Sequence, residues 1–467
     1  MRLAAFPCKK YVHCNNVFYH TFLAFKKKSD YNQLMYTKKN LNIMLLCKVV
    51  DNYGDIGFVY RLCRALSDCE PSFLLSLVVS DLDAFAMIAP GVDSKKTIQD
   101  FCGWTILDWD AAEPCCTFFA QKQPQVILEC FQCGRPQWLE DELFSPEQKK
   151  VVQIFNIEYL TAEPWADDFH LLKSATRSAF VKKLNFMPGF TAQTGGLVLD
   201  RPFVQSIENA QAAISQYAPF VQKSVCAVLK DTRAISVLFF SYERNMEPIC
   251  MALSAWNATV QNEQKSVHVL LASGKSSEPF FKTACALKSP FAFTKLPPLP
   301  QTAWDALLTR CSFLFVRGED SFARACLCGV PFVWQAYPQE NEFQLVKVHA
   351  VLCRMEPFFF QEDFALLSQV WFCYNRTAAP LGDEAKELWH RVFTAKPTDS
   401  AEQARSAQDN APEVSQTESH LANLLVKLFL RVPKMQAGFA TFSRSLLANG
   451  DLAAHLVLAI HSLHDLF

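Results

Sequence analysis

The chain has 467 residues, of which 50% are apolar and 19% are charged; this composition excludes a wholly disordered protein and predicts two or three domains. Its formal net charge of −1 is unevenly distributed, because residues 1–40 carry eight Lys or Arg and one acid, whereas the remainder carries 37 basic and 45 acidic residues. An acidic body argues against a protein that binds nucleic acid through its phosphates. No apolar run approaches the ~18 residues that a membrane-spanning helix requires, so we expect no membrane partner.

The basic N-terminal segment differs in composition from the rest of the chain. Residues 1–43 contain clustered lysines but no compact apolar stretch followed by a small-residue cleavage site, so they do not resemble a secretory signal. We expect this basic leader to lie outside the fold. The 18 cysteines do not have the spacing of a small secreted disulfide protein, which predicts reduced thiols and a cytoplasmic location.

Short apolar runs alternate with amphipathic segments from residue 41 onward, which is typical of α/β units built on parallel sheets. In a first series we expect a helix at 58–67 and strands at 41–50, 74–79, 126–128 and 151–157. In a second series we expect strands at 234–240, 267–272, 313–316 and 331–334. The two series predict two Rossmann-like domains, at 44–222 and 223–395.

The C-terminal part of the chain differs in texture from these domains. Residues 396–420 lack aromatic residues and contain one large aliphatic residue, which predicts a polar insertion or linker. Residues 421–467 form C-terminal helices in this interpretation, at 421–432 and from 446 to the end.

The first segment that could carry chemistry is Val-Val-Asp-Asn-Tyr-Gly-Asp-Ile-Gly at 49–57. It lies between a predicted strand and a predicted helix, where open parallel sheets bind their ligands. Two carboxylates, Asp51 and Asp55, would project into that crevice while the glycines allow a tight turn. The alternative is that Asp51 caps a turn and Asp55 caps the helix, and spacing alone does not separate the two.

The second segment, at 315–325, again runs from a strand through a short loop into a helix. The helix N-terminus, with Arg317 and Ser321, is suited to a diphosphate. Glu319 and Asp320 would instead accept hydrogen bonds from sugar hydroxyls or orient Arg317. The alternative is a capping cluster with a surface ion pair.

Metal sites are not indicated by the sequence. Asp108 and Asp110 have the D-x-D form used by metal-dependent sugar transferases, but a surface turn explains them better. Cys130 and Cys133 form a C-x-x-C pair without a second pair at zinc-finger spacing, which favours packing. We therefore expect no metal.

Taken together and in this order, these segments resemble the EarP family of protein-arginine rhamnosyltransferases. The similarity covers about residues 44–395, and its most specific strings lie at 49–57, 188–191, 194–197, 317–322, 329–334 and 337–339. The resemblance implies a GT-B architecture, two Rossmann-like domains facing a cleft, with the last helix often crossing back to the first. It also implies inverting, metal-independent transfer of L-rhamnose from dTDP-β-L-rhamnose to one arginine of translation elongation factor P. No cofactor beyond this donor is implied.

The resemblance also assigns site residues. Asp55 would be the general base, Asp51 a second required carboxylate and Glu319 a further essential residue. The donor-binding residues would be Asn52, Tyr53, Gly54, Phe240, Tyr242, Gln301, Arg317, Gly318, Asp320 and Ser321. The basic leader, the insertion at 396–420 and Gln344, near where the family has a histidine, depart from the pattern.

Two other functions fit the same residues. One is a dTDP-sugar-dependent GT-B transferase with a different acceptor, because a fold does not determine the substrate. The other is a non-catalytic protein that binds a nucleotide sugar or the elongation factor, against which the intact carboxylates count. A nicotinamide dehydrogenase is disfavoured because G-x-G-x-x-G does not follow the first strand.

Overall fold

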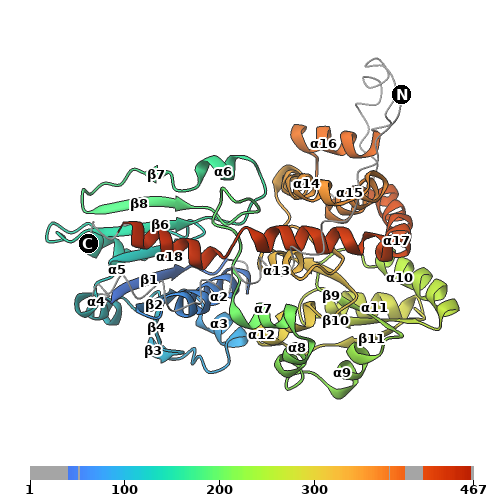
Figure 1. The fold of residues 1–467 in the computed structure, drawn as a ribbon, viewed down its shortest axis with the longest axis horizontal. Helices are drawn as coiled ribbons and strands as arrows, with labels where there is room; N and C mark the ends of the chain where they lie inside the picture. Colours follow the sequence, from blue (N-terminus) through green and yellow to red (C-terminus); the bar gives the residue numbers. More distant parts are fainter. Residues whose placement is uncertain (1–39, 51–52, 378, 395–413, 464–467) are drawn as a thin grey trace, which may run out of the picture. The chain divides into compact units, whose positions relative to one another are not determined.

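The computed structural model describes residues 40–50, 53–377, 379–394 and 414–463, which form two α/β lobes (Figure 1). We use "N-lobe" for residues 41–199 together with the final helix, and "C-lobe" for residues 200–448. Each lobe has one sheet covered by helices, as the alternation of apolar and amphipathic segments predicts. This arrangement confirms the predicted fold class.

The N-lobe contains an eight-stranded sheet of order β3-β4-β2-β1-β5-β6-β8-β7. The strands are β1 (Leu41–Cys47), β2 (Phe73–Val79), β3 (Ile98–Phe101), β4 (Trp104–Asp108), β5 (Val126–Cys130), β6 (Val152–Ile157), β7 (Lys173–Ser174) and β8 (Val181–Phe186). All neighbours pair in parallel except the edge strands β3 and β7. The strand order of the parallel part is that of a doubly wound Rossmann sheet, which places the ligand crevice at β1 and β5. The helices are α2 (Gly54–Cys69), α3 (Leu82–Ile88), α4 (Ala112–Gln121), α5 (Gln137–Leu143) and α6 (Trp165–Phe169).

The C-lobe contains a five-stranded parallel sheet of order β11-β10-β9-β12-β13. Its strands are β9 (Ala234–Phe239), β10 (Ser266–Leu271), β11 (Ala292–Lys295), β12 (Phe313–Arg317) and β13 (Phe332–Gln335). The strand order reverses between β9 and β12, so the ligand crevice of this sheet lies at the carboxyl ends of these two strands. The helices are α7 (Arg201–Glu208), α8 (Ala210–Tyr217), α9 (Lys223–Lys230), α10 (Glu247–Val260), α11 (Ser277–Ala286), α12 (Gln301–Leu308), α13 (Asp320–Cys328), α14 (Gln344–Met355), α15 (Gln361–Asn375), α16 (Asp383–Thr394) and α17 (Val414–Ala448).

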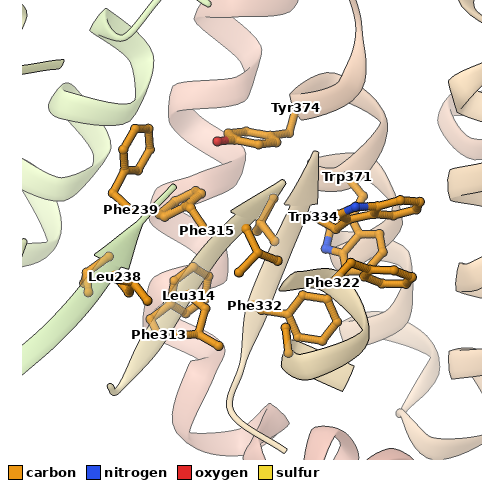
Figure 2. Packing of buried hydrophobic residues seen from close by; sticks show 14 of the residues in the cluster. Leu238, Phe239, Phe313, Leu314, Phe315, Phe322, Phe332, Trp334, Trp371 and Tyr374 are labelled. Atoms are coloured by element: carbon orange, nitrogen blue, oxygen red, sulfur yellow. The ribbon is translucent and has the colours of Figure 1, made fainter. Parts of the chain in front are cut away.

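Aromatic side chains fill the C-lobe core, which accounts for part of the unusual phenylalanine content (Figure 2). Phe322 of α13 stacks on Trp334 of β13 with ring centroids 4.0 Å apart. Trp371 of α15 contacts both Trp334 and Phe332. Burying large aromatic surfaces stabilises the fold, and stacked or edge-to-face pairs add to this. The close packing fixes α13, whose first residues belong to the site described below.

The last two helices join the lobes. Helix α17 packs on α10, α13 and α15 in the C-lobe, and α18 (Leu452–Ser462) packs on α2 in the N-lobe (Figure 1). Between them, Gly450 has φ +92°, and a Cβ there would lie 2.9 Å from the His455 ring. Asp451 then caps α18 and also accepts a hydrogen bond from the Leu199 backbone N–H at 2.8 Å. The chain thus returns to the N-lobe through a turn that depends on glycine.

Three expectations about boundaries are wrong. The leader was expected to extend to residue 43, but β1 begins at Leu41 because Leu41 and Ile43 are buried in the N-lobe core. Part of the expected linker at 396–420 is helical, since α17 begins at Val414; residues 395–413 lie outside the described residues. The helix expected from residue 446 onward is interrupted at 449–451 by the glycine turn.

Candidate active site

Two adjoining cavities lie between the lobes, at the carboxyl ends of strands from both sheets. The first has a volume of about 190 Å³, and residues 296–299 form part of its wall; we call it the proline-rim cavity. The second has a volume of about 320 Å³ and is lined by Asp55 and Glu319; we call it the carboxylate cavity. Four residues line both cavities: Gly54, Gly318, Glu319 and Asp320. A ligand could therefore extend from one cavity into the other.

Asp55 lies in the first turn of α2, not at the helix cap. The N-cap position is occupied by Tyr53, which makes no side-chain capping bond. The Asp55 carboxylate is 5% exposed and accepts a hydrogen bond from the Val50 backbone N–H at 2.7 Å. The alternative that Asp55 caps the helix is therefore wrong. Asp51 and Asn52 lie outside the described residues.

The loop after β12 places Arg317 and Glu319 at the cleft. The guanidinium of Arg317 lies 4.5 Å from the ring centroids of both Phe240 and Tyr242, so cation–π contacts hold it between two aromatic rings. Glu319 accepts a hydrogen bond from the Leu160 backbone N–H across the cleft at 3.3 Å. The structure thus brings together Arg317, Phe240 and Tyr242, which the sequence placed in separate segments.

Gln301, Trp304 and Ser321 give the proline-rim cavity a polar interior. The Gln301 amide donates to the Gly57 carbonyl at 2.6 Å, whereas its Oε1 atom is buried without a hydrogen-bond partner. The Trp304 indole lies against Phe240 and donates to the Ser321 hydroxyl at 3.2 Å. A buried acceptor beside aromatic faces is suited to a planar ligand that carries an N–H group.

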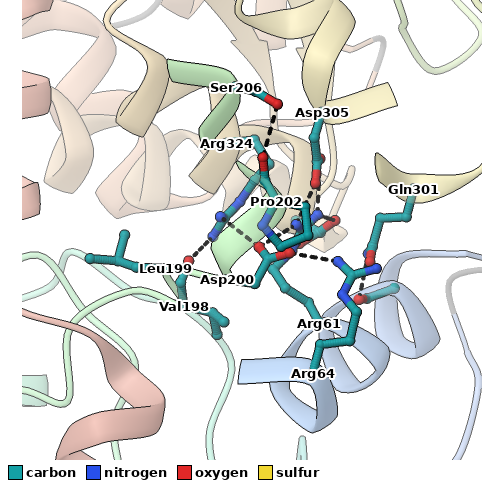
Figure 3. Close-up of polar contacts among 12 residues, drawn as sticks. Arg61, Arg64, Val198, Leu199, Asp200, Pro202, Ser206, Gln301, Asp305 and Arg324 are labelled. Atoms are coloured by element: carbon teal, nitrogen blue, oxygen red, sulfur yellow. Dashed lines mark hydrogen bonds and ion pairs between the residues drawn. The ribbon is translucent and has the colours of Figure 1, made fainter. Parts of the chain in front are cut away.

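Asp320 lines both cavities and also belongs to a buried group of charges, of which Figure 3 labels Arg61, Asp200 and Asp305. Both of its oxygens accept hydrogen bonds from Arg61 of α2, at 3.0 Å each. Arg61 also donates to Asp305 of α12 at 2.5 Å and to Asp200 at 2.8 Å. We use "charge cluster" for Arg61, Arg64, Asp200, Asp305, Asp320 and Arg324. It connects α2 of the N-lobe to α12 and α13 of the C-lobe, so Asp320 has a role in fixing the lobes.

Burial and the opposite charges shift the pKa values within this cluster. Burial is the largest influence on the pKa of Asp200 and of Asp320 and would raise both, but the neighbouring arginines, Arg61 first among them, together outweigh it and lower both. For Asp305 burial prevails and the pKa is raised. Burial, together with the neighbouring Arg61, lowers the pKa of Arg324 to about 10. The pKa of each of these four residues thus depends on the charges of its neighbours in the cluster.

Three aromatic residues of the carboxylate cavity were missed from the sequence. They are Phe58 in α2, Phe131 after β5 and Tyr159 after β6. Each comes from a different segment, so no local motif contains them. Their signal is positional, since Phe131 and Tyr159 follow strands whose carboxyl ends face the crevice.

The described ranges contain no cluster of three or more His, Cys, Asp or Glu suited to a metal ion. The Asp108 carboxylate accepts a hydrogen bond from the Asp110 backbone N–H at 3.1 Å, which is a turn. Among helices whose residues are described, none is long and apolar enough to cross a membrane.

Two Rossmann-like lobes with a ligand-sized cleft between them have the GT-B architecture. Residues 43–458 match the family of elongation factor P (EF-P) rhamnosyltransferases, EarP, and the chain belongs to this family. A protein-arginine rhamnosyltransferase of Shewanella oneidensis is 33% identical over 324 residues, which are 66% of this chain and 79% of the relative. One from Pseudomonas putida is 28% identical, over 71% of this chain and 86% of the relative. A solved structure concerning EarP-mediated arginine glycosylation of EF-P has a TM-score of 0.47 and 18% identity, covering 90% of this chain and 99% of that one.

Proposed function

We propose that this protein transfers L-rhamnose from dTDP-β-L-rhamnose to a guanidinium nitrogen of one arginine of elongation factor P, with inversion and without a metal. The observation that carries the proposal is that Asp55 of the N-lobe and Glu319 of the C-lobe line one cavity, which adjoins a second cavity bordered by Arg317. Family membership supplies the sugar and the acceptor. A cytoplasmic location follows from this proposal, because elongation factors act there.

The proline-rim cavity is the proposed nucleotide site. Thymine would lie against Phe240, with its N–H donating to the buried Oε1 of Gln301. The diphosphate would reach Arg317, the Ser321 hydroxyl and the N-terminus of α13, where positive charge and backbone N–H groups stabilise anions. Tyr53, Gly54 and Gly318 line the same cavities, and Asn52 is proposed to complete this site.

The carboxylate cavity is the proposed site of transfer. An arginine guanidinium has a pKa above ~12, and its delocalised cation is a poor nucleophile. Asp55 would orient one nitrogen and accept its proton as the N–C1 bond forms. The C1–O bond breaks at the same time, and dTDP leaves with the electron pair, stabilised by Arg317 and α13. Attack by this nitrogen on the face of C1 opposite the departing dTDP would give inversion, and Asp51 and Glu319 would stabilise the cationic centre.

Intact-mass analysis of elongation factor P tests this proposal. The acceptor is incubated with dTDP-β-L-rhamnose and the wild-type protein, Asp55→Asn, or Asp83→Asn. Asp83 is a matched control, since it is an exposed aspartate in the first turn of α3. We expect one deoxyhexose on a single arginine with the wild type and the control, and none with Asp55→Asn.

Three other results would contradict the proposal in part or in whole. A near-normal rate for Asp55→Asn would remove Asp55 from the role of base. If the wild type gives no product while dTDP, but not UDP or GDP, raises the melting temperature, the donor site stands and the acceptor is wrong. Absence of both effects would overturn the proposal entirely.

A further inference from the structure

An aromatic wall lines one side of the carboxylate cavity. It consists of Phe58, Phe131 and Tyr159. The Phe131 and Tyr159 rings are stacked, with centroids 4.5 Å apart and planes 19° apart, and the centroids of Phe58 and Phe131 are 5.1 Å apart with planes tilted by 57°. Tyr159 is 39% exposed, so the wall ends in an aromatic ring that a ligand can reach. Nothing in the rhamnose-transfer scheme above uses these rings.

The backbone that carries Phe131 is strained. Phe131 and Gln132 have φ of +62° and +49°, the left-handed region that non-glycine residues seldom occupy. The Phe131 N–H donates to the Ile157 carbonyl, and the Gln132 amide donates to Glu158, both at 2.6 Å. Such strain persists where surrounding structure enforces it, and it clusters at functional sites. Here its result is the placement of the Phe131 ring beneath Tyr159.

The wall faces negative charge. Tyr159 lines the same cavity as Asp55 and Glu319. Burial raises the pKa of the Tyr159 hydroxyl, and the two carboxylates raise it further, so this phenol stays neutral. An aromatic face next to carboxylates is a site for a flat cation, because the face attracts positive charge while the acids accept hydrogen bonds from its edge. A guanidinium satisfies both requirements at once. A lysine ammonium is not planar and has no edge that can pair with an acid while its face is stacked.

We propose that the Tyr159 ring, supported by Phe131 and Phe58, binds the face of the acceptor guanidinium and thereby selects arginine over lysine. The inference rests on the proposed function and deepens it. In this arrangement the wall holds the guanidinium plane in place while its edge meets Asp55, which sets the nitrogen that is presented to the sugar. Tyr159 thus contributes to acceptor binding, and the donor site in the neighbouring cavity is independent of it.

Steady-state kinetics with Tyr159→Leu, Tyr159→Phe and Phe360→Leu test this inference. Phe360 is the matched control, because it is an 82% exposed aromatic residue that lines neither cavity. We expect Tyr159→Leu to raise KM for the acceptor about tenfold, the size of a desolvated cation–π contact, while the affinity for dTDP is unchanged. Tyr159→Phe keeps the ring, so its KM for the acceptor should stay close to that of the wild type. If only the hydroxyl contributed, Tyr159→Phe would raise this KM as Tyr159→Leu does.

A binding measurement separates failure of this inference from failure of the proposed function. Saturation-transfer NMR with N-acetylarginine methylamide, in the presence of dTDP, should detect binding to the wild type and not to Tyr159→Leu; the lysine analogue should not bind to either. Binding of the arginine probe without any transfer to elongation factor P would overturn the proposed function and leave the wall intact. An unchanged acceptor KM in Tyr159→Leu, or equal binding of both probes, would overturn the wall. If Tyr159→Leu loses dTDP-dependent stabilisation, Phe131→Leu serves as the second variant, and an unchanged acceptor KM there overturns the inference.

Discussion

Replacing Arg61 with methionine removes the cation that joins the two lobes in the charge cluster. Arg61 is fully buried and makes five hydrogen bonds, shared among Asp200, Asp305 and Asp320. Deleting one partner of a buried ion pair costs about 3–5 kcal/mol, because the remaining charge has lost its water and its counterion. Three carboxylates depend on Arg61, so we expect a loss of about 5 kcal/mol in the free energy of unfolding.

The assay is urea unfolding at pH 7.5, followed by fluorescence. The matched control is Arg391→Met, which removes an arginine whose partner, Glu387, lies 2.8 Å away at a site where both side chains are more than half exposed. Exposed pairs of this kind contribute about 0.3–0.5 kcal/mol, so the control should change stability little. A further variant, Asp305→Asn, removes one charge but keeps the shape, and we expect an intermediate loss of about 1–3 kcal/mol.

A loss below about 1 kcal/mol for Arg61→Met would refute this reasoning, since it would mean that the carboxylates find water or protons at no cost. The same result for Arg61→Met and Arg391→Met would show that burial is unimportant at this position. Arg61 holds Asp320, which lies in the chain between Glu319 and Ser321 of the site. Arg61→Met protein that remains folded should therefore also have a lower rate of rhamnosyl transfer.

Three further changes test the packing. Burial, with a contribution from His455, lowers the pKa of His170 to about 4, so between about pH 6.5 and 4 the unfolded chain binds a proton that the folded chain excludes. Lowering the pH from 7.5 to 5.0 should therefore reduce the melting temperature less in His170→Phe than in the wild type. An equal reduction in both proteins would contradict this reasoning. Gly450→Ala should destabilise by more than about 1 kcal/mol in urea unfolding, because a Cβ there meets the His455 ring; a neutral effect would contradict the turn geometry. Phe322→Ala should cost about 3–5 kcal/mol by leaving a cavity against Trp334, and a loss below about 1 kcal/mol would contradict tight packing there.

All eight strands expected from the apolar runs are present, with boundaries shifted by up to three residues at either end. All of them except β13, which is an edge strand, are central strands, and they are largely buried and therefore continuously apolar. The five missed strands are β3, β4, β7, β8 and β11, three of which are sheet edges. The missed edge strands are short and partly exposed, and β8 contains Lys182 and Lys183, so the pattern of these four strands does not differ from that of a loop.

For the site, local sequence sufficed in the segments that follow β1 and β12. Asp55, Arg317 and Glu319 could be selected from their own segments, because the carboxyl ends of parallel strands are where such sheets bind ligands. The same segments contain the glycines that these loops need, Gly54 and Gly57 in the first and Gly318 in the second. It did not separate Glu319 from Asp320, since two adjacent acids have the same local pattern.

Only the tertiary structure assigned the two acids to different roles. Both acids line the two cavities, but Asp320 accepts hydrogen bonds from Arg61, which lies 259 positions away in the chain, whereas Glu319 accepts one from the Leu160 backbone N–H. The wall of Phe58, Phe131 and Tyr159 likewise forms from three segments that meet only when β1, β5 and β6 lie side by side. Periodicity and propensity act over a few residues, whereas ion pairs and ring stacks depend on distances that the packing of distant elements creates. The chemistry of the loops is therefore readable along the chain, and the partners of their side chains are decided in space.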